Sequence, residues 1–103
     1  PVRIAQEYIR SHIDRQISLE EVSEKAFVSP GYLSTLFKER TGKNFSDYVI
    51  EMRIDEAKRL LRSATYSISE VAEQVGYADA RHFSKVFQKI VGIKPTSYRK
   101  FYV

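Results

Sequence analysis

The sequence predicts an all-α domain, and three observations support that fold class. Apolar residues recur at helical spacing along almost all of the 103 residues, only four Gly and three Pro interrupt them, and capping residues stand directly before the periodic segments. A chain of this length is expected to form one domain with one modest core. It has no cysteine, which excludes disulfides, thiolate zinc sites and cysteine nucleophiles.

The first two helices are predicted on either side of a short loop. Apolar residues from Val2 to about Asp14 fall on one stripe, as in an amphipathic helix. Ser18 starts the second helix, and we expect it to form a capping box with Glu21, in which each side chain accepts a hydrogen bond from the other residue's backbone N–H. His12 lies beside the first stripe with no second ligand near it in sequence, so we interpret it as structural or solvent-facing rather than catalytic.

A third helix and a longer fourth helix follow. Ser29 is the expected N-cap of a helix from Pro30 to about Thr41, because proline suits the first helical position and restricts the residue before it. Gly42 is the expected C-terminal stop. Asn44 then caps the longest periodic segment, about 44–63, which would be roughly 30 Å long at 1.5 Å per residue. That length suits a linker helix.

The same pattern then returns. Ser67 and Glu70 form a second capping box before a short helix that ends at Gly76, and another helix follows its N-cap, Asp79. A last short helix, about 95–101, is expected to pack its aromatic residues under this part of the chain. The inward side of the helix after the second turn is assigned to Phe83, Val86, Phe87 and Ile90.

The two halves of the chain form an internal repeat. With a shift of 49, Ser18, Glu21, Val22 and Glu24 match Ser67, Glu70, Val71 and Glu73, and with a shift of 50, Ser34, Phe37, Gly42 and Tyr48 match Ser84, Phe87, Gly92 and Tyr98. One residue has therefore been gained or lost in a turn. Two capped helices joined by a tight turn are typical of a helix-turn-helix unit, here at about 18–42 and 67–92. The first unit lacks a turn glycine.

Positive charge is concentrated near the end of the sequence. Residues 80–103 hold six Lys or Arg and no acidic residue, although the net charge of the whole chain is only +4. Such a surface favours a polyanion, most simply nucleic acid, while a solvated basic face without a partner gives the same composition. Two such units can occupy major grooves about 34 Å apart on one face of a duplex. A helical bundle that binds another protein is the alternative.

Six ordered motifs cover nearly the whole chain. They are Ser18-Leu19-x-x-Val22, Ser29-Pro30-x-Tyr32-Leu33-Ser34-x-x-Phe37-Lys38, Arg53-x-x-x-Ala57-x-x-Leu60-Leu61, Ile68-x-x-Val71-Ala72-x-x-Val75-Gly76-Tyr77, His82-Phe83-Ser84-x-x-Phe87 and Gly92-x-x-Pro95-x-x-Tyr98-Arg99. Together they resemble the C-terminal DNA-binding domain of the AraC/XylS-type bacterial transcription regulators. The resemblance implies about seven helices, arranged as two helix-turn-helix subdomains joined by a long central helix, and sequence-specific binding of double-stranded DNA.

The resemblance also implies which residues meet the DNA. Base contacts correspond to Gly31, Ser34 and Thr35 in the first unit and to Ala80, Arg81, His82 and Lys85 in the second. Phosphate contacts are expected from Lys38, Arg40, Lys43, Lys89 and Lys94. Because the first unit offers only small side chains, we expect the second unit to contribute more direct base readout.

The roles of several of these residues stay open at this point. Arg81 can pair bidentately with guanine or clamp a phosphate. His82 can contact a base or lie partly against the core. Tyr48 and Tyr98 are interpreted as core residues. Gln88 stands where the family often has a basic residue, which removes one expected phosphate contact.

The remaining expectations concern the class of protein and its partners. The two His are far apart in sequence, and there is neither a Gly-rich phosphate loop nor a carboxylate cluster with metal spacing, so we expect neither an enzyme nor a cofactor. No segment is long and apolar enough for a membrane span, so a cytoplasmic bacterial protein is expected. The resemblance implies an N-terminal sensing or receiver domain that is absent from this sequence. The motif Asn44-Phe45-x-x-Tyr48 is similar to response-regulator forms, with a ligand-binding parent as the alternative. RNA polymerase is the expected partner if the regulator is an activator.

Overall fold

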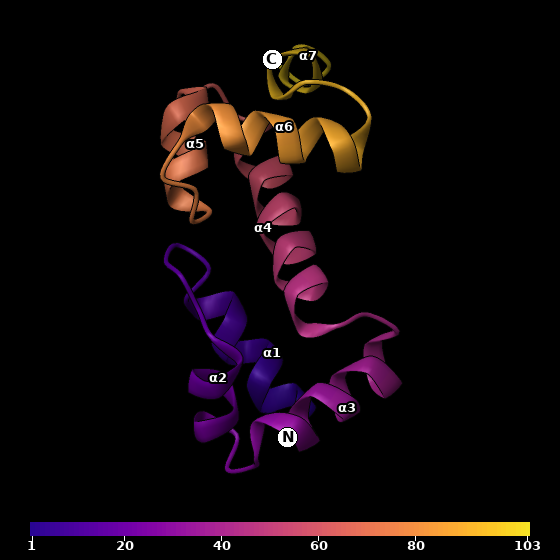
Figure 1. Cartoon of the computed structure of the whole chain (residues 1–103). Coiled ribbons are helices and arrows are strands. Elements are labelled where there is room, and N and C mark those ends of the chain that lie inside the picture. The colour runs from indigo at the N-terminus through magenta and orange to yellow at the C-terminus, as the bar shows by residue number, and fades with distance from the viewer. The chain divides into compact units, whose positions relative to one another are not determined.

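The all-α prediction is confirmed. The computed structural model describes residues 1–103, and its only regular elements are seven helices (Figure 1). They are α1 (Val2–Ser11), α2 (Leu19–Lys25), α3 (Pro30–Thr41), α4 (Phe45–Leu61), α5 (Ile68–Gln74), α6 (Ala80–Val91) and α7 (Pro95–Lys100). The first and fourth helices are shorter than expected, since α1 ends at Ser11 and α4 at Leu61. None of the helices combines the length and the apolar character that crossing a membrane requires.

The expectation of a single core was wrong. The chain divides into two compact units, Pro1–Met52 (unit 1) and Arg53–Val103 (unit 2). The boundary falls inside α4, so each unit contains one part of that helix. The physical reason is the repeat itself, because each half brings its own pair of short capped helices and its own buried aromatic residues.

The core of unit 1 forms where α1, α2 and α3 meet. Phe37 on α3 is fully buried, and its ring lies edge-on to Phe45 and Tyr48, with centroid distances of 6.0 and 5.0 Å. Tyr48 is therefore a core residue, as predicted. The buried members of this cluster are Ala5, Ile9, Ile13, Val22, Leu33, Phe37 and Val49.

The core of unit 2 is built around α6. Phe83 and Phe87 are fully buried, and Phe87 lies 5.5 Å from the ring of Tyr98 on α7, which confirms Tyr98 as a core residue. Two expectations for this unit were wrong. Ile90 is 49% exposed because the last turn of α6 leaves this position uncovered, as α3 does at its counterpart Arg40, and Phe101 is 77% exposed because it follows the end of α7.

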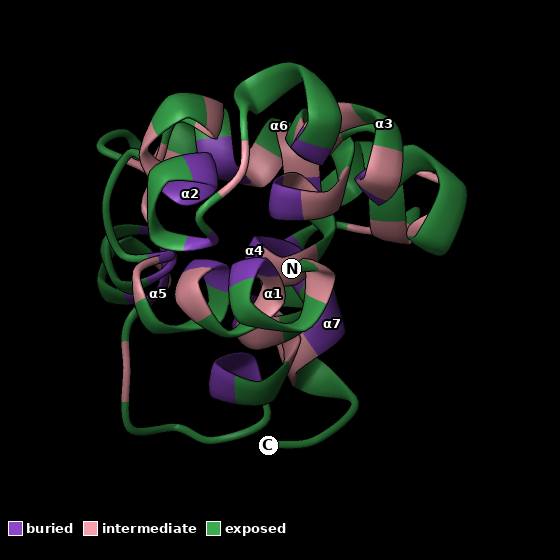
Figure 2. Ribbon diagram, turned by 90° about the horizontal axis from the view of Figure 1, so that it is seen from below, coloured by how far each residue is buried: buried purple, intermediate pink, exposed green.

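The two units repeat the same burial pattern. Residues 31–42 and 81–92 show the same order of buried, half-buried and exposed positions, and so do residues 22–26 and 71–75. Figure 2 shows the buried positions as short bands on the helices, separated by exposed ones. A shared pattern means that α3 and α6 lie on their units in the same way, so their outward side chains can be compared position by position.

The turns of the two units differ by one residue. In unit 1 two residues, Phe27 and Val28, separate the C-cap of α2 from the N-cap of α3. In unit 2 three residues, 76–78, do so between α5 and α6. Gly76 has φ +93°, and Phe27 takes the same left-handed conformation at φ +59°. The position that the sequence showed to lack glycine is therefore occupied by a phenylalanine in a glycine conformation.

The two predicted capping boxes also differ. Ser67 accepts a hydrogen bond from the N–H of Glu70, and the Glu70 carboxylate accepts one from the N–H of Ser67, so this box is complete. The corresponding prediction for Ser18 was only half right. Its hydroxyl accepts from the N–H of Glu21 at 3.0 Å, but the carboxylate of Glu21 instead accepts hydrogen bonds from Arg15 and Tyr8. A charged donor competes better for a carboxylate than a backbone amide does.

Candidate nucleic-acid interface

Helix α6 presents a basic outward face. The side chain of Asp79 accepts a hydrogen bond from the N–H of Arg81 at 2.8 Å, which starts the helix, and Gly92 ends it at φ +98°. Its inward face is fixed by the buried rings of Phe83 and Phe87. Arg81 and Lys85 are both exposed, and they lie one turn apart on the outward face because residues four apart are neighbours on a helix.

The charge of the two units differs sharply. Unit 1 holds seven Lys or Arg and eight Asp or Glu, a net charge of −1, whereas unit 2 holds ten and five, a net charge of +5. The ion pairs are Arg15 with Glu21, Lys43 with Glu51 and Arg59 with Glu56. The candidate contact residues of unit 2 take part in none of them. Their charge is therefore available to an external polyanion, since no internal acid neutralises it.

His82 lies beside the turn that precedes α6. Its ring is edge-on to Tyr77, with centroids 5.3 Å apart and an interplanar angle of 84°. His82 is still exposed to solvent, whereas Ala80, another base-contact candidate at this end of α6, is half-buried. His82 therefore packs against Tyr77, the core-side role that the sequence left open, while its exposure leaves room for a partner; a base contact by His82 stays a prediction.

Arg53 is a residue whose role the sequence did not reveal. It is only 6% exposed, and its Nη1 donates a hydrogen bond of 2.7 Å to the carbonyl oxygen of Val75, the C-cap of α5. Its guanidinium also lies 5.7 Å from the ring centroid of Tyr77. Burial raises the pKa of Tyr77, against the lowering effect of the nearby Arg53 charge. Arg53 therefore holds the turn that carries Tyr77 and, through it, His82.

A sequence signal for Arg53 was available. Arg53, Ala57, Leu60 and Leu61 follow the i, i+4, i+7, i+8 spacing of one helix face. An arginine on an otherwise apolar stripe is expected to be buried and therefore to need a hydrogen-bond acceptor.

Helix α3 repeats the geometry of α6 with different chemistry. Gly31 and Thr35 are exposed and correspond to Arg81 and Lys85, while Ser34 is half-buried. A Cβ added at Gly31 would meet no atom within 4 Å, so the space above it is open. These outward positions of unit 1 thus carry only short side chains, and the expected larger share of direct base readout by unit 2 stays a prediction.

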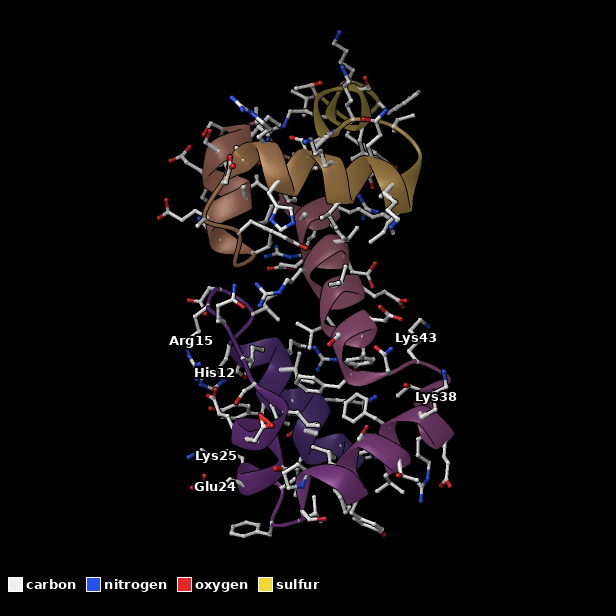
Figure 3. The ribbon with its side chains drawn as sticks, in the orientation of Figure 1. His12, Arg15, Glu24, Lys25, Lys38 and Lys43 are labelled. Carbon is white, nitrogen blue, oxygen red and sulfur yellow. The ribbon has the colours of Figure 1, made fainter.

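The phosphate-contact candidates fall into two groups. Lys38, Arg40, Lys89 and Lys94 are exposed and form no ion pair, whereas the Nζ of Lys43 lies 3.2 Å from a carboxylate oxygen of Glu51. In Figure 3, Lys38 and Lys43 lie at the C-terminal end of α3 and in the loop after it, away from His12 and Arg15. Any phosphate contact of Lys43 therefore has to compete with Glu51.

His12 is a structural residue, as predicted. Its Nδ1 lies 2.9 Å from the carbonyl oxygen of Tyr8, and the two rings stack with centroids 4.1 Å apart. The hydroxyl of Tyr8 in turn donates to Glu21, which ties α1 to α2. No three His, Cys, Asp or Glu side chains come close enough together to hold a metal ion.

Two capped helix pairs, each with an exposed second helix, define the chain as a double helix-turn-helix protein. The family model described as a helix-turn-helix domain matches residues 22–100. The chain belongs to this family, in its AraC type.

Several known proteins are similar to this chain. The HTH-type transcriptional regulator YobQ of Bacillus subtilis (strain 168) is 33% identical over 92 residues, which are 89% of this chain and 38% of YobQ. The C-terminal domain of AraT, a response regulator from Geobacillus stearothermophilus, has a TM-score of 0.89 at 39% identity, covering 97% of this chain and 84% of that one. The DNA-binding domain of AdpA, solved in complex with a target DNA, has a TM-score of 0.90 at 26% identity, covering 99% and 92%. This chain spans well under half the length of YobQ.

Proposed function

We propose that this chain is the DNA-binding output domain of a bacterial transcription regulator, in which α3 and α6 enter successive major grooves of one duplex. The observation that carries the proposal is the outward face of α6, where Arg81, Lys85 and Lys89 are exposed and form no ion pair. The similarity to the AdpA domain bound to its target DNA supports it. The repeat of unit geometry supports the use of two recognition helices.

Unit 2 supplies most of the charge-based readout in this proposal. Arg81 lies in the first turn of α6, where recognition helices contact base edges, and a guanidinium can pair with O6 and N7 of guanine. Each such pair contributes roughly 1–3 kcal/mol of discrimination between bases. Lys85 follows one turn later, and Lys89 and Lys94 serve as phosphate contacts.

The spacing of the two half-sites is set by one duplex turn. Helix α4 has 17 residues, about 26 Å at 1.5 Å per residue. Half-sites about 34 Å apart suit one turn of B-DNA. Inserting about 5 bp between them turns one half-site to the opposite face and should abolish two-site binding.

The parent protein is proposed to be a longer regulator. The short share of YobQ that the chain covers and the similarity to the C-terminal domain of AraT support an N-terminal receiver or sensing domain outside this sequence. We propose a non-enzymatic role in the bacterial cytoplasm, without a cofactor. RNA polymerase is the protein partner if the regulator activates transcription.

The direct test is DNA binding by the whole chain at controlled salt. A duplex is first selected from a random pool, and its affinity is then compared for Arg81→Ala, Lys85→Ala and the control Arg3→Ala. The control removes an exposed positive charge from α1, outside both recognition helices. We expect tenfold or greater loss for the first two variants and little change for the control. Equal affinity for all three variants and the native chain would reject the assignment of α6.

The salt dependence separates phosphate contacts from base contacts. Five phosphate contacts predict a slope of log affinity against log salt of roughly −4 to −5, at about −0.9 for each. Lys94→Ala should weaken binding to all sequences uniformly and reduce that slope by about 0.9. An unchanged slope would show that Lys94 does not contact a phosphate.

A further inference from the structure

Phe27 has a strained backbone conformation and an exposed side chain, and neither feature stabilises the fold. Its φ of +59° lies in the left-handed region, which residues with a bulky side chain disfavour. Its side chain is 90% exposed, so almost no burial offsets the backbone strain. Unit 2 has Gly76 at the corresponding position, where the same conformation is free of strain. The ring of Phe27 contributes little to packing inside the molecule, so its position suits contact with a binding partner.

A second aromatic residue lies at the same end of α3. Tyr32 is the third residue of that helix and is 54% exposed. Its counterpart His82 packs against Tyr77, but the residue that corresponds to Tyr77 in unit 1 is Val28, so no ring shields Tyr32 in the same way. Phe27 lies three residues before the start of α3, within about 10 Å of chain. We call Phe27 and Tyr32 the aromatic edge of unit 1.

The other outward residues of this end of α3 offer little to a partner. Gly31 has no side chain, and Thr35 and Ser34 are short. Unit 1 as a whole has a net charge of −1, so long-range attraction to phosphate does not favour it as it favours unit 2. The largest exposed side chains at this end of unit 1 are therefore those of the aromatic edge, and their rings offer an apolar contact surface.

Only one apolar group is presented on base edges in the major groove, the C5 methyl of thymine. Since the N-terminal residues of a recognition helix contact base edges, we propose that the aromatic edge contacts a thymine methyl in the half-site of unit 1. This inference rests on the proposed DNA-binding function. Unit 1 then reads sequence by apolar contact, whereas unit 2 reads it with charged donors.

The test removes thymine methyls one at a time. The selected duplex is prepared with single 2′-deoxyuridine substitutions, each of which deletes only the C5 methyl, and affinity for the 103-residue chain is measured at fixed salt. We expect about fourfold weaker binding at one or two thymines in one half-site, which corresponds to the ~0.8 kcal/mol of one buried methyl-sized group.

Two variants link that effect to the aromatic edge. Phe27→Gly should raise the Tm, because glycine relieves the strain, and should still weaken DNA binding and remove the thymine-to-deoxyuridine difference. A purely structural role for Phe27 does not predict higher stability with lower affinity. Tyr32→Ala provides an independent measurement of the ratio between the affinities for the thymine duplex and the deoxyuridine duplex. The matched control is Phe101→Ala, which removes a 77% exposed ring from unit 2 outside its recognition helix and should leave the ratio of the two affinities unchanged.

The outcomes for the thymine contact and for the proposed function can be told apart. If no thymine of the selected duplex shows a methyl effect, or if both variants keep the native ratio, the contact does not exist, while the proposed function stands as long as specific binding persists. Unchanged DNA affinity in both variants would likewise overturn the thymine contact. If no duplex can be selected, the proposed function fails and this inference fails with it.

Discussion

Replacing Arg53 by methionine tests whether one buried side chain holds the turn of unit 2. Methionine keeps most of the aliphatic volume but removes the guanidinium, so it deletes the 2.7 Å hydrogen bond to the carbonyl of Val75 and the contact with Tyr77. A hydrogen bond to a charged group contributes about 1.5–3 kcal/mol. A cation–π contact adds about 0.5–1 kcal/mol. Part of this loss in stability is offset, because burying a charged guanidinium costs free energy and burying methionine does not.

The net loss for Arg53→Met is therefore about 2 kcal/mol. For a domain of this size 1 kcal/mol shifts the Tm by about 4–8 °C, so we expect a decrease of roughly 10 °C in thermal unfolding followed by circular dichroism. Arg53→Lys keeps the charge but not the planar donor group, so its Tm should lie between those of the native chain and Arg53→Met. DNA affinity should decrease as well, since the turn positions His82.

The control for this experiment lies on the same helix. Arg59 is exposed and pairs with Glu56 at 2.7 Å, and exposed pairs of this kind contribute about 0–1 kcal/mol. Arg59→Met should therefore change the Tm by only a few degrees. If Arg53→Met were no less stable than Arg59→Met, the reasoning about the buried guanidinium would be refuted.

Three further predictions concern other parts of the chain. The hydrogen bonds from Arg15 and Tyr8 lower the pKa of Glu21 from its ordinary 4.5 to about 2. The charged carboxylate therefore stabilises the folded chain above pH 4.5. This contribution to the free energy of unfolding is lost as the pH falls towards 2. Glu21→Gln should flatten the pH dependence of unfolding in that range, and an unchanged profile would contradict the shift. Gly42→Ala should destabilise the chain by about 1 kcal/mol in urea unfolding, because φ is +77° while no atom lies within 4 Å of an added Cβ, so that backbone strain alone decides the sign. Glu51→Gln should strengthen DNA binding at low salt by freeing Lys43, and no gain in a shift assay would mean that Lys43 does not meet a phosphate.

Much of the fold could be predicted because local signals specify it. Asn44 and Asp79 accept hydrogen bonds from backbone N–H groups at the start of their helices, as their positions before apolar segments indicated. Gly42 and Gly92 end α3 and α6 in the left-handed conformation. These features depend on a few neighbouring residues, so the sequence contains all the information that is needed.

Other features could not be predicted, since they depend on partners far away in sequence or on competition between partners. Val75 lies 22 residues from Arg53, and spacing on one helix face shows that an arginine is buried but not which carbonyl it meets. Glu21 was expected to complete a capping box, and only the position of α1 brings Arg15 and Tyr8 to the carboxylate first. Ile90 follows the apolar stripe of α6, yet it is 49% exposed, because burial depends on which other helices pack against the last turn.

The sequence by itself determined the number and order of the helices, the repeat, and the concentration of positive charge near the C-terminus. It did so because caps, periodicity and composition are local properties of the chain. Only the tertiary structure placed the boundary between the two units inside α4, which gives them net charges of −1 and +5, separated exposed cations from paired ones, and put Phe27 in a strained and exposed position. Those properties depend on the path of the backbone and on which side chains pack together in the folded chain, and helix caps, periodicity and composition do not specify either.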